Sequence, residues 1–155
     1  MSEYRWTILG EPVAKGRPRF NRASGFAYTP AKTRNWEALA VEAFARGWDG
    51  GPVDGLAELE VVAVFSRPKR LMRAKDPAGR VPHSSRPDAD NVLKAVGDAI
   101  EKAGVLRNDS QVWLATVRKF YAAKTEGPRV EVVLRLSKCL QNAQKRPAIA
   151  RSGAG

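Results

Sequence analysis

The chain has 155 residues, 43% of them apolar, which suffices for one domain with a hydrophobic core and excludes a largely disordered protein. Its 27 Lys and Arg against 16 Asp and Glu give a formal net charge of +11, which favours a polyanionic partner, nucleic acid ahead of an anionic membrane surface. One Cys and one His exclude an intrachain disulfide and argue against a Cys/His zinc site, so carboxylates are the plentiful metal ligands.

The first half of the chain combines strands, a basic loop and a helix. Residues 1–10 lack the pattern of a signal peptide and no apolar run can span a bilayer, so we expect a cytoplasmic protein. A strand over residues 4–9 precedes the basic loop (residues 10–20), which is rich in Gly and Pro, and a short strand near 25–30. Helical spacing of apolar residues predicts a helix from residue 31 to Gly47, and alternation predicts a strand over 56–65.

The second half begins with a long connection, the basic arm (residues 67–86), which carries seven basic residues and one acid. We expect this arm to order on binding DNA. A helix is predicted from about 91 to 103, then strands over 112–121 and 129–136 that form an antiparallel hairpin. The order predicts a single α+β domain over residues 1–136, with two main helices on a small mixed or antiparallel sheet, and a flexible basic tail over 137–155.

The stretch "RPDADNVLKAV" (residues 86–96) places two aspartates at the predicted start of the second helix. One interpretation is structural: Asp88 caps the helix and Asp90 pairs with Lys94, one turn later. The other is a metal site, since carboxylates repel DNA unless a divalent cation lies between them. Asp109 can join them within one chain only if the chain doubles straight back along a helix about 20 Å long; otherwise it completes the site across a dimer interface.

Two stretches resemble the RusA family of Holliday junction resolvases. The first is "RPDADNVLKAVGDAIEKAGVLRNDSQV", and the second is "GEPVAKGRPRF" in the basic loop. One departure is Asn108, where the family commonly has an acid. The matching positions are Pro87, Asp88, Asp90, Asn91, Lys94, Asp98, Ala99, Gly104, Asp109, Gln111 and Val112, with Lys15, Arg17, Pro18, Arg19 and Phe20 in the loop.

The resemblance implies a homodimeric endonuclease, often phage-encoded, that acts in DNA recombination and repair by cutting four-way junctions with symmetric nicks. Asp88, Asp90 and Asp109 would hold Mg²⁺, for which Mn²⁺ can substitute, and the metal would activate water for attack on the phosphodiester. Lys94 would contact the scissile phosphate or orient a carboxylate, and Asp98 would either position Lys94 or form a surface ion pair.

The basic residues supply candidate DNA contacts, and the aromatic residues are expected mainly in the core. Phe20, Phe26, Trp36 and Trp113 favour core packing, with wedging of the two Phe into bases as the alternative for them. Two other functions stay open: a nuclease for other branched or flapped DNA, and a non-catalytic DNA-binding recombination accessory protein. The candidate DNA contacts are Lys15, Arg17 and Arg19 in the basic loop and Lys69, Arg70, Arg73 and Lys75 in the basic arm.

Overall fold

A computed structural model describes residues 2–16 and 18–137 of the chain. The predicted tail therefore lies, apart from Ser137, outside the described residues. The α+β class with two main helices is confirmed. The elements are β1 (Ser2–Leu9), β2 (Arg19–Phe20), β3 (Ala27–Tyr28), α1 (Ala31–Arg46), β4 (Leu56–Phe65), η1 (Lys69–Leu71), β5 (Val81–Pro82), α2 (Ala89–Lys102), η2 (Asp109–Gln111), β6 (Val112–Tyr121) and β7 (Arg129–Ser137).

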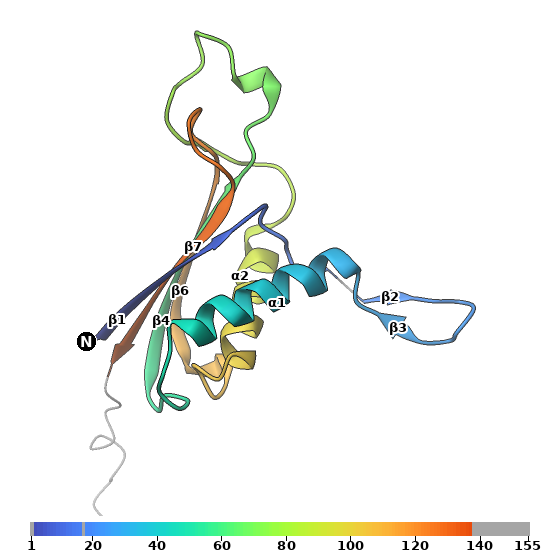
Figure 1. Ribbon diagram of the computed structural model, residues 1–155, viewed down its shortest axis with the longest axis vertical. Coiled ribbons are helices and arrows are strands. Elements are labelled where there is room, and N and C mark those ends of the chain that lie inside the picture. Colours follow the sequence, from blue (N-terminus) through green and yellow to red (C-terminus); the bar gives the residue numbers. More distant parts are fainter. Residues whose placement is uncertain (1, 17, 138–155) are drawn as a thin grey trace, which may run out of the picture.

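The main sheet is mixed and has five strands in the order β1-β7-β4-β6-β5 (Figure 1). β4 pairs in parallel with β6 and antiparallel with β7. At the two edges, β1 pairs antiparallel with β7 and β5 pairs antiparallel with β6. The predicted hairpin of β6 with β7 is therefore wrong, because β4 lies between them. The C-terminal half of β4 is buried at every position, which suits a central strand covered on both faces.

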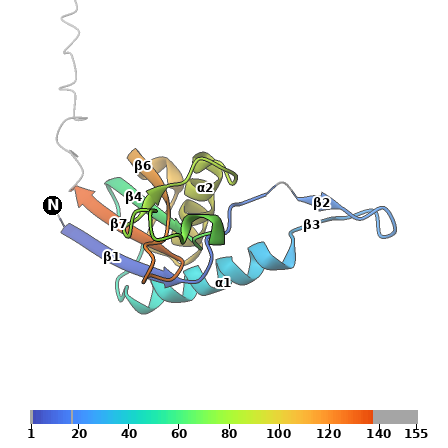
Figure 2. The ribbon, with the colours of Figure 1, turned by 90° about the horizontal axis from the view of Figure 1, so that it is seen from above.

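Both long helices cover one face of this sheet and pack on each other (Figures 1 and 2). Alternate residues of β4, including Leu59 and Val61, point into the shared core with Phe44 of α1 and Ile100 of α2. α2 ends in a Schellman motif: Gly104 has φ +76°, its N–H donates to Glu101, and the next N–H donates to Ile100. No helix within residues 2–16 and 18–137 is both long and apolar enough to cross a membrane.

The basic arm is folded, so the expectation that it orders only on DNA is wrong. The reason lies in its own polar contacts, which replace a hydrophobic core. The guanidinium of Arg67 donates to the carbonyl oxygens of Leu71 and Gly79, both at 2.8 Å, and to that of Ala122 at 3.3 Å. At the far end of the arm Arg80 forms ion pairs with Glu126 and Glu131. These bonds tie the arm to the β6–β7 connection and hold its shape.

Several aromatic side chains lie where the sequence pattern did not predict them. β2 and β3 form a separate two-stranded hairpin that projects from the body of the molecule (Figure 2), and Phe20 and Phe26 on it are exposed. Trp113 is exposed because a register shift between β4 and β6 takes it out of the ladder. Core packing was therefore the wrong prediction for these three residues, whereas Trp36 is buried as expected.

His83, to which the sequence assigns no role, is buried. Its ring stacks on Phe65 with 4.2 Å between centroids and lies 4.5 Å from the ring of Tyr121. Burial, with a smaller effect from the charge of Lys119, lowers the pKa of His83. This imidazole therefore belongs to the packing beneath the basic arm.

We predict that the Arg80–Glu126 ion pair makes stability depend on pH in the acid range. The hydrogen bond from Arg80 lowers the pKa of Glu126 from 4.5 to about 2. Since the folded state has the lower pKa, the stabilisation is present above pH 4.5 and is lost as the pH falls toward 2. Glu126→Gln should lower the melting temperature at pH 7 by about 3–6 °C. The gap to the wild type should close between pH 4.5 and 2, measured by circular dichroism; a constant gap would refute the prediction.

Candidate active site

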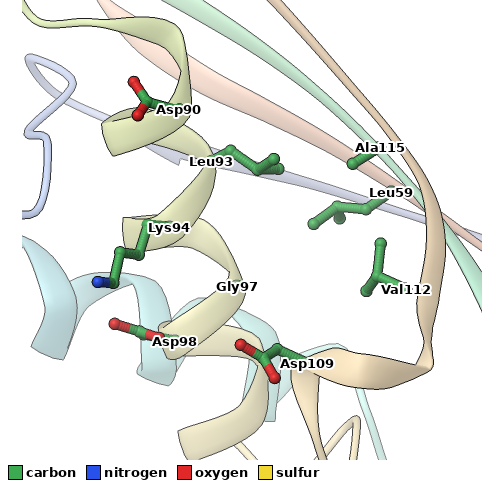
Figure 3. Close-up of a pocket in the computed structure, with 9 residues that line it drawn as sticks. All are labelled: Leu59, Asp90, Leu93, Lys94, Gly97, Asp98, Asp109, Val112 and Ala115. Atoms are coloured by element: carbon green, nitrogen blue, oxygen red, sulfur yellow. The ribbon is translucent and has the colours of Figure 1, made fainter.

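The aspartates at the start of α2 do not make the two contacts that the structural interpretation predicts, a helix cap and an ion pair. Asp88 occupies the N-cap position with an extended backbone, but its side chain makes no capping hydrogen bond. Within the described residues Asp90 and Lys94 form no ion pair, although both line one groove (Figure 3). A helix cap and an i,i+4 pair therefore do not account for these charged side chains.

Charge pairing separates the predicted metal ligands from most other acids of the chain. Within the described part of the chain, the carboxylates of Asp88, Asp90 and Asp109 neither form an ion pair nor accept a hydrogen bond. All three are exposed, so their carboxylates are open to solvent and to a cation. The acids that pair with Lys or Arg are Glu3, Glu37, Glu42, Asp54, Glu60, Asp76, Asp98, Glu126 and Glu131.

Asp109 lies at the opposite end of α2 from the other two aspartates. Its backbone N–H donates to the carboxylate of Glu101 at 3.2 Å, which places it beside the last turn of the helix. Glu101 is eleven residues beyond Asp90, a distance of about 16 Å along a helix. The chain turns back along α2 only after η2, with β6. Among residues 2–16 and 18–137, no three His, Cys, Asp or Glu side chains lie close enough together to hold a metal ion. Asp109 nevertheless lines the same groove as Asp90, Lys94 and Asp98 (Figure 3).

The basic loop lies against α2 beside Asp90. The backbone N–H of Lys15 donates to the carbonyl oxygen of Asn91 at 3.2 Å, and the ammonium of Lys15 forms an ion pair with Asp98. Asp98 therefore pairs with Lys15, and not with Lys94. Arg17 lies outside the described residues. The two stretches that are far apart in sequence thus form one groove, lined by Lys15, Gly16, Pro18, Asp90, Asn91, Lys94 and Asp98.

Comparison with known proteins agrees with this arrangement. The model of the family described as "Endodeoxyribonuclease RusA" matches residues 10–135. The chain belongs to the RusA family. This confirms the expected family and, at that level, the prediction of a DNA endonuclease.

Two relatives resemble the chain over most of their length. One is "Crossover junction endodeoxyribonuclease RusA" of Aquifex aeolicus, 26% identical over 85% of this chain and 92% of the relative. The other is "Uncharacterized protein YqaN" of Bacillus subtilis, 31% identical over 84% of this chain and 94% of the relative. The family match over residues 10–135 includes both the basic loop and α2.

The departure from the RusA pattern at Asn108 has a structural role. Asn108 is the N-cap of η2, and its side-chain oxygen accepts from the N–H of Ser110 at 2.8 Å. The amide oxygen of Gln111 accepts from the N–H groups of Arg107 and Asn108, while its amide nitrogen donates to Val53 at 2.8 Å. This turn holds Asp109 in place, and an aspartate at position 108 would satisfy the same cap.

Lys119 is a candidate positioning residue that the sequence pattern missed. Its ammonium donates to the carbonyl oxygens of Ser85 and Pro87 at 2.8 and 2.7 Å, and so fixes the backbone just before Asp88. A lysine within an alternating strand carries no signal of such a contact, because the segment it holds is more than thirty residues away in sequence. The contact exists because the fold brings the end of β6 beside the start of α2.

The residues of the basic arm that are predicted to contact DNA are exposed, but one of them is paired with an acid. Lys69, Arg70 and Lys75 are exposed beside η1, and within the described residues they form no ion pair. Arg73 donates to Asp76 at 3.1 Å, and this contact lowers the pKa of the Asp76 carboxyl. Arg73 is therefore the least available of these cations, and the DNA-binding role of the whole set stays a prediction.

We predict that position 108 acts mainly as a cap in this RusA-family protein. Asn108→Ala removes the acceptor for Ser110 and should cost about 1 kcal/mol of unfolding free energy. Asn108→Asp keeps an acceptor of similar quality and should stay within about 0.5 kcal/mol of the wild type. Urea unfolding of the three proteins measures both differences. Equal destabilisation by Ala and Asp would show that the cap is not what this side chain contributes.

Proposed function

We propose that this chain is a divalent-metal-dependent endonuclease that resolves Holliday junctions by paired symmetric nicks. The supporting observation is the groove in which the basic loop lies beside the unpaired carboxylate of Asp90 on α2. The Aquifex relative carries the name of a crossover junction endodeoxyribonuclease, which supports the same substrate class here. A cytoplasmic setting, where DNA and Mg²⁺ are both present, stays a prediction.

We further propose that the site is completed in a homodimer, because Asp90 and Asp109 lie toward opposite ends of one groove and no three described carboxylates meet within one chain (Figure 3). Two-fold symmetry also provides two sites for the two cuts that a junction requires. β6 offers a surface for this contact. Its edge away from β4 is paired with β5 only at Phe120 and Tyr121, and Trp113 and Leu114 beside that edge are exposed. An open edge with exposed apolar side chains is a ready site for strand pairing with a second copy.

An antiparallel pairing of two β6 edges brings the distant carboxylates to the same end of the sheet. β6 runs from the Asp109 turn toward Lys119, which holds the backbone before Asp88. A two-fold axis near the middle of the open edge would carry the partner subunit's Asp109 to the level of Lys119 and Tyr121. In this arrangement each site combines Asp88 and Asp90 of one chain with the partner subunit's Asp109.

These three carboxylates would hold the divalent cation, Mg²⁺ with Mn²⁺ as substitute. A cation in such a site acidifies a water molecule and offsets charge on the phosphate. Lys94 is exposed in the same groove as Asp90, so its ammonium can approach the scissile phosphate. Lys15 is held by Asp98 at the groove wall, where it would contact the DNA backbone. Arg19 on β2 and the basic arm would contact the backbone outside the groove.

We predict that the protein cuts a labelled four-way junction at paired positions in Mg²⁺ and not in EDTA. Asp90→Asn should lower the cleavage rate by about 100-fold or more while junction binding is kept, because it removes a metal ligand without a phosphate contact. Asp49→Asn changes an exposed acid outside the groove and is the matched control. Denaturing gels measure cleavage, and mobility shift in EDTA measures binding.

The same assay separates the other functions. Equal cutting of flap and junction DNA would favour a nuclease for branched DNA in general. Binding of the junction without cleavage in Mg²⁺ or Mn²⁺ would favour an accessory protein. Cleavage that survives Asp90→Asn would exclude Asp90 as a metal ligand.

We predict that mixing two inactive variants restores activity if the site is shared between chains. In a heterodimer of Asp90→Asn with Asp109→Asn, one composite site carries both substitutions and the other carries neither. That dimer should nick one strand at about half the wild-type rate, whereas each variant alone stays inactive. The measurement is single-strand nicking after the two proteins are co-refolded. Absence of nicking, with exchange verified by differently tagged chains, would place all three carboxylates in one chain.

A further inference from the structure

The projecting hairpin, residues 19–28, carries aromatic side chains that the fold leaves in solvent. Phe20 is 64% exposed, Phe26 is 75% exposed and Tyr28 is 48% exposed. The hairpin is not hydrogen-bonded to the main sheet, and an isolated pair of strands gains little stability by itself. Clustered exposed aromatics on such an element indicate an interaction surface. We infer that this hairpin stacks on the base faces that a DNA branch point exposes.

The pairing of the two strands sorts the hairpin into two faces. Arg19 lies opposite Tyr28, so these side chains share a face. Phe26, two positions before Tyr28, accepts a hydrogen bond from the N–H of Asn21 at 2.9 Å, so the strand pairing extends to it and alternation puts it on the same side. Phe20 lies opposite Ala27 on the other face. The first face thus combines an arginine with two aromatic rings. Arginine and aromatic planes are the side chains on which nucleic-acid bases stack.

The positive charge around the hairpin favours a polyanion as its binding partner. Between Pro12 and Trp36 the sequence contains no acid, and its basic residues are Lys15, Arg17, Arg19, Arg22, Lys32 and Arg34. A second copy of a chain with net charge +11 would meet repulsion at this segment, whereas a phosphate backbone would be attracted. Nucleic acid is therefore favoured over a protein partner.

The hairpin follows in sequence a loop that is anchored beside the proposed active site. It continues directly from the basic loop, which is fixed to α2 by Lys15 through both Asn91 and Asp98. The tip of the hairpin has a defined turn. The side-chain oxygen of Asn21 accepts a hydrogen bond from the N–H of Ala23 at 2.9 Å, and Gly25 adopts a positive φ of +72°. The hairpin extends outward from the point where the basic loop leaves the body of the molecule (Figure 2), so DNA held by a phosphate contact in the groove would continue toward it.

A branch point offers what a continuous duplex does not. Inside a duplex both faces of each base pair are covered by neighbours, whereas the pairs that flank a crossover can be unstacked at lower cost. An aromatic face that stacks there favours branched over linear DNA without reading sequence. This inference rests on the proposed function, because it assigns the surface by which that nuclease would distinguish its substrate.

The test compares two phenylalanines on the same hairpin. Phe26→Ala should weaken binding of a four-way junction by about 10-fold, with duplex binding nearly unchanged. Phe20→Ala, on the opposite face, is the matched control and should change junction affinity less than about 3-fold. Binding is measured in EDTA, with 2-aminopurine beside the crossover. The wild type should change its fluorescence on binding, Phe20→Ala should keep this change, and Phe26→Ala should lose it.

Three results would overturn the inference. The first is wild-type affinity and fluorescence for Phe26→Ala. The second is an equal loss of junction and duplex binding, which would make the hairpin a general DNA contact. The third is a change of elution volume for Phe26→Ala in gel filtration, which would assign the hairpin to contacts between copies. If the wild type never cleaves but shows the Phe26-dependent fluorescence change, the proposed nuclease function is wrong and the stacking role of the hairpin stands. If it cleaves normally without that change, the nuclease function stands and the stacking role is wrong.

Discussion

The parallel pairing of β4 with β6 is the constraint from which the arrangement of the site follows. A parallel pair needs a crossover connection, and here the crossover contains the basic arm and α2. Because α2 must run back along the sheet before β6 can start, its two ends lie at opposite ends of β6. Asp88 and Asp90 begin the helix and Asp109 follows it, so the topology itself separates the carboxylates that the RusA signature groups.

The same constraint leaves β6 near the edge of the sheet. β4 is paired on both sides, and β5 covers only the last two residues of β6. An open strand edge favours pairing with another chain, and the two-fold partner would bring in the missing carboxylate. The same topology thus puts the aspartates at opposite ends of α2 and leaves the edge of β6 open. Together these two features favour a site shared between subunits.

Electrostatics distributes the acids unevenly over the fold. On the sheet, Glu3, Arg135, Glu60 and Arg118 form a chain of ion pairs across four strands, which neutralises acids far from the groove. The groove keeps unpaired carboxylates next to Lys94 and the basic loop. A polyanion is therefore attracted by the protein as a whole and repelled at one point, and a divalent cation at that point would reverse the repulsion. The hairpin extends the same basic segment outward.

Local sequence patterns determined the helices, most strand positions, the α+β class and the family resemblance, because periodicity and capping depend on neighbours in the chain. The Val92 to Ile100 stripe and the end of α2 at Gly104 are examples. Tertiary structure alone decided which strands are neighbours, that Phe26 and Trp113 are exposed, that Arg67 folds the basic arm, and that Lys119 holds the start of α2. It also decided that Asp90 and Asp109 face one groove from opposite ends, since the path of the chain along α2 and into β6, and not the spacing of its motifs, places them (Figure 3).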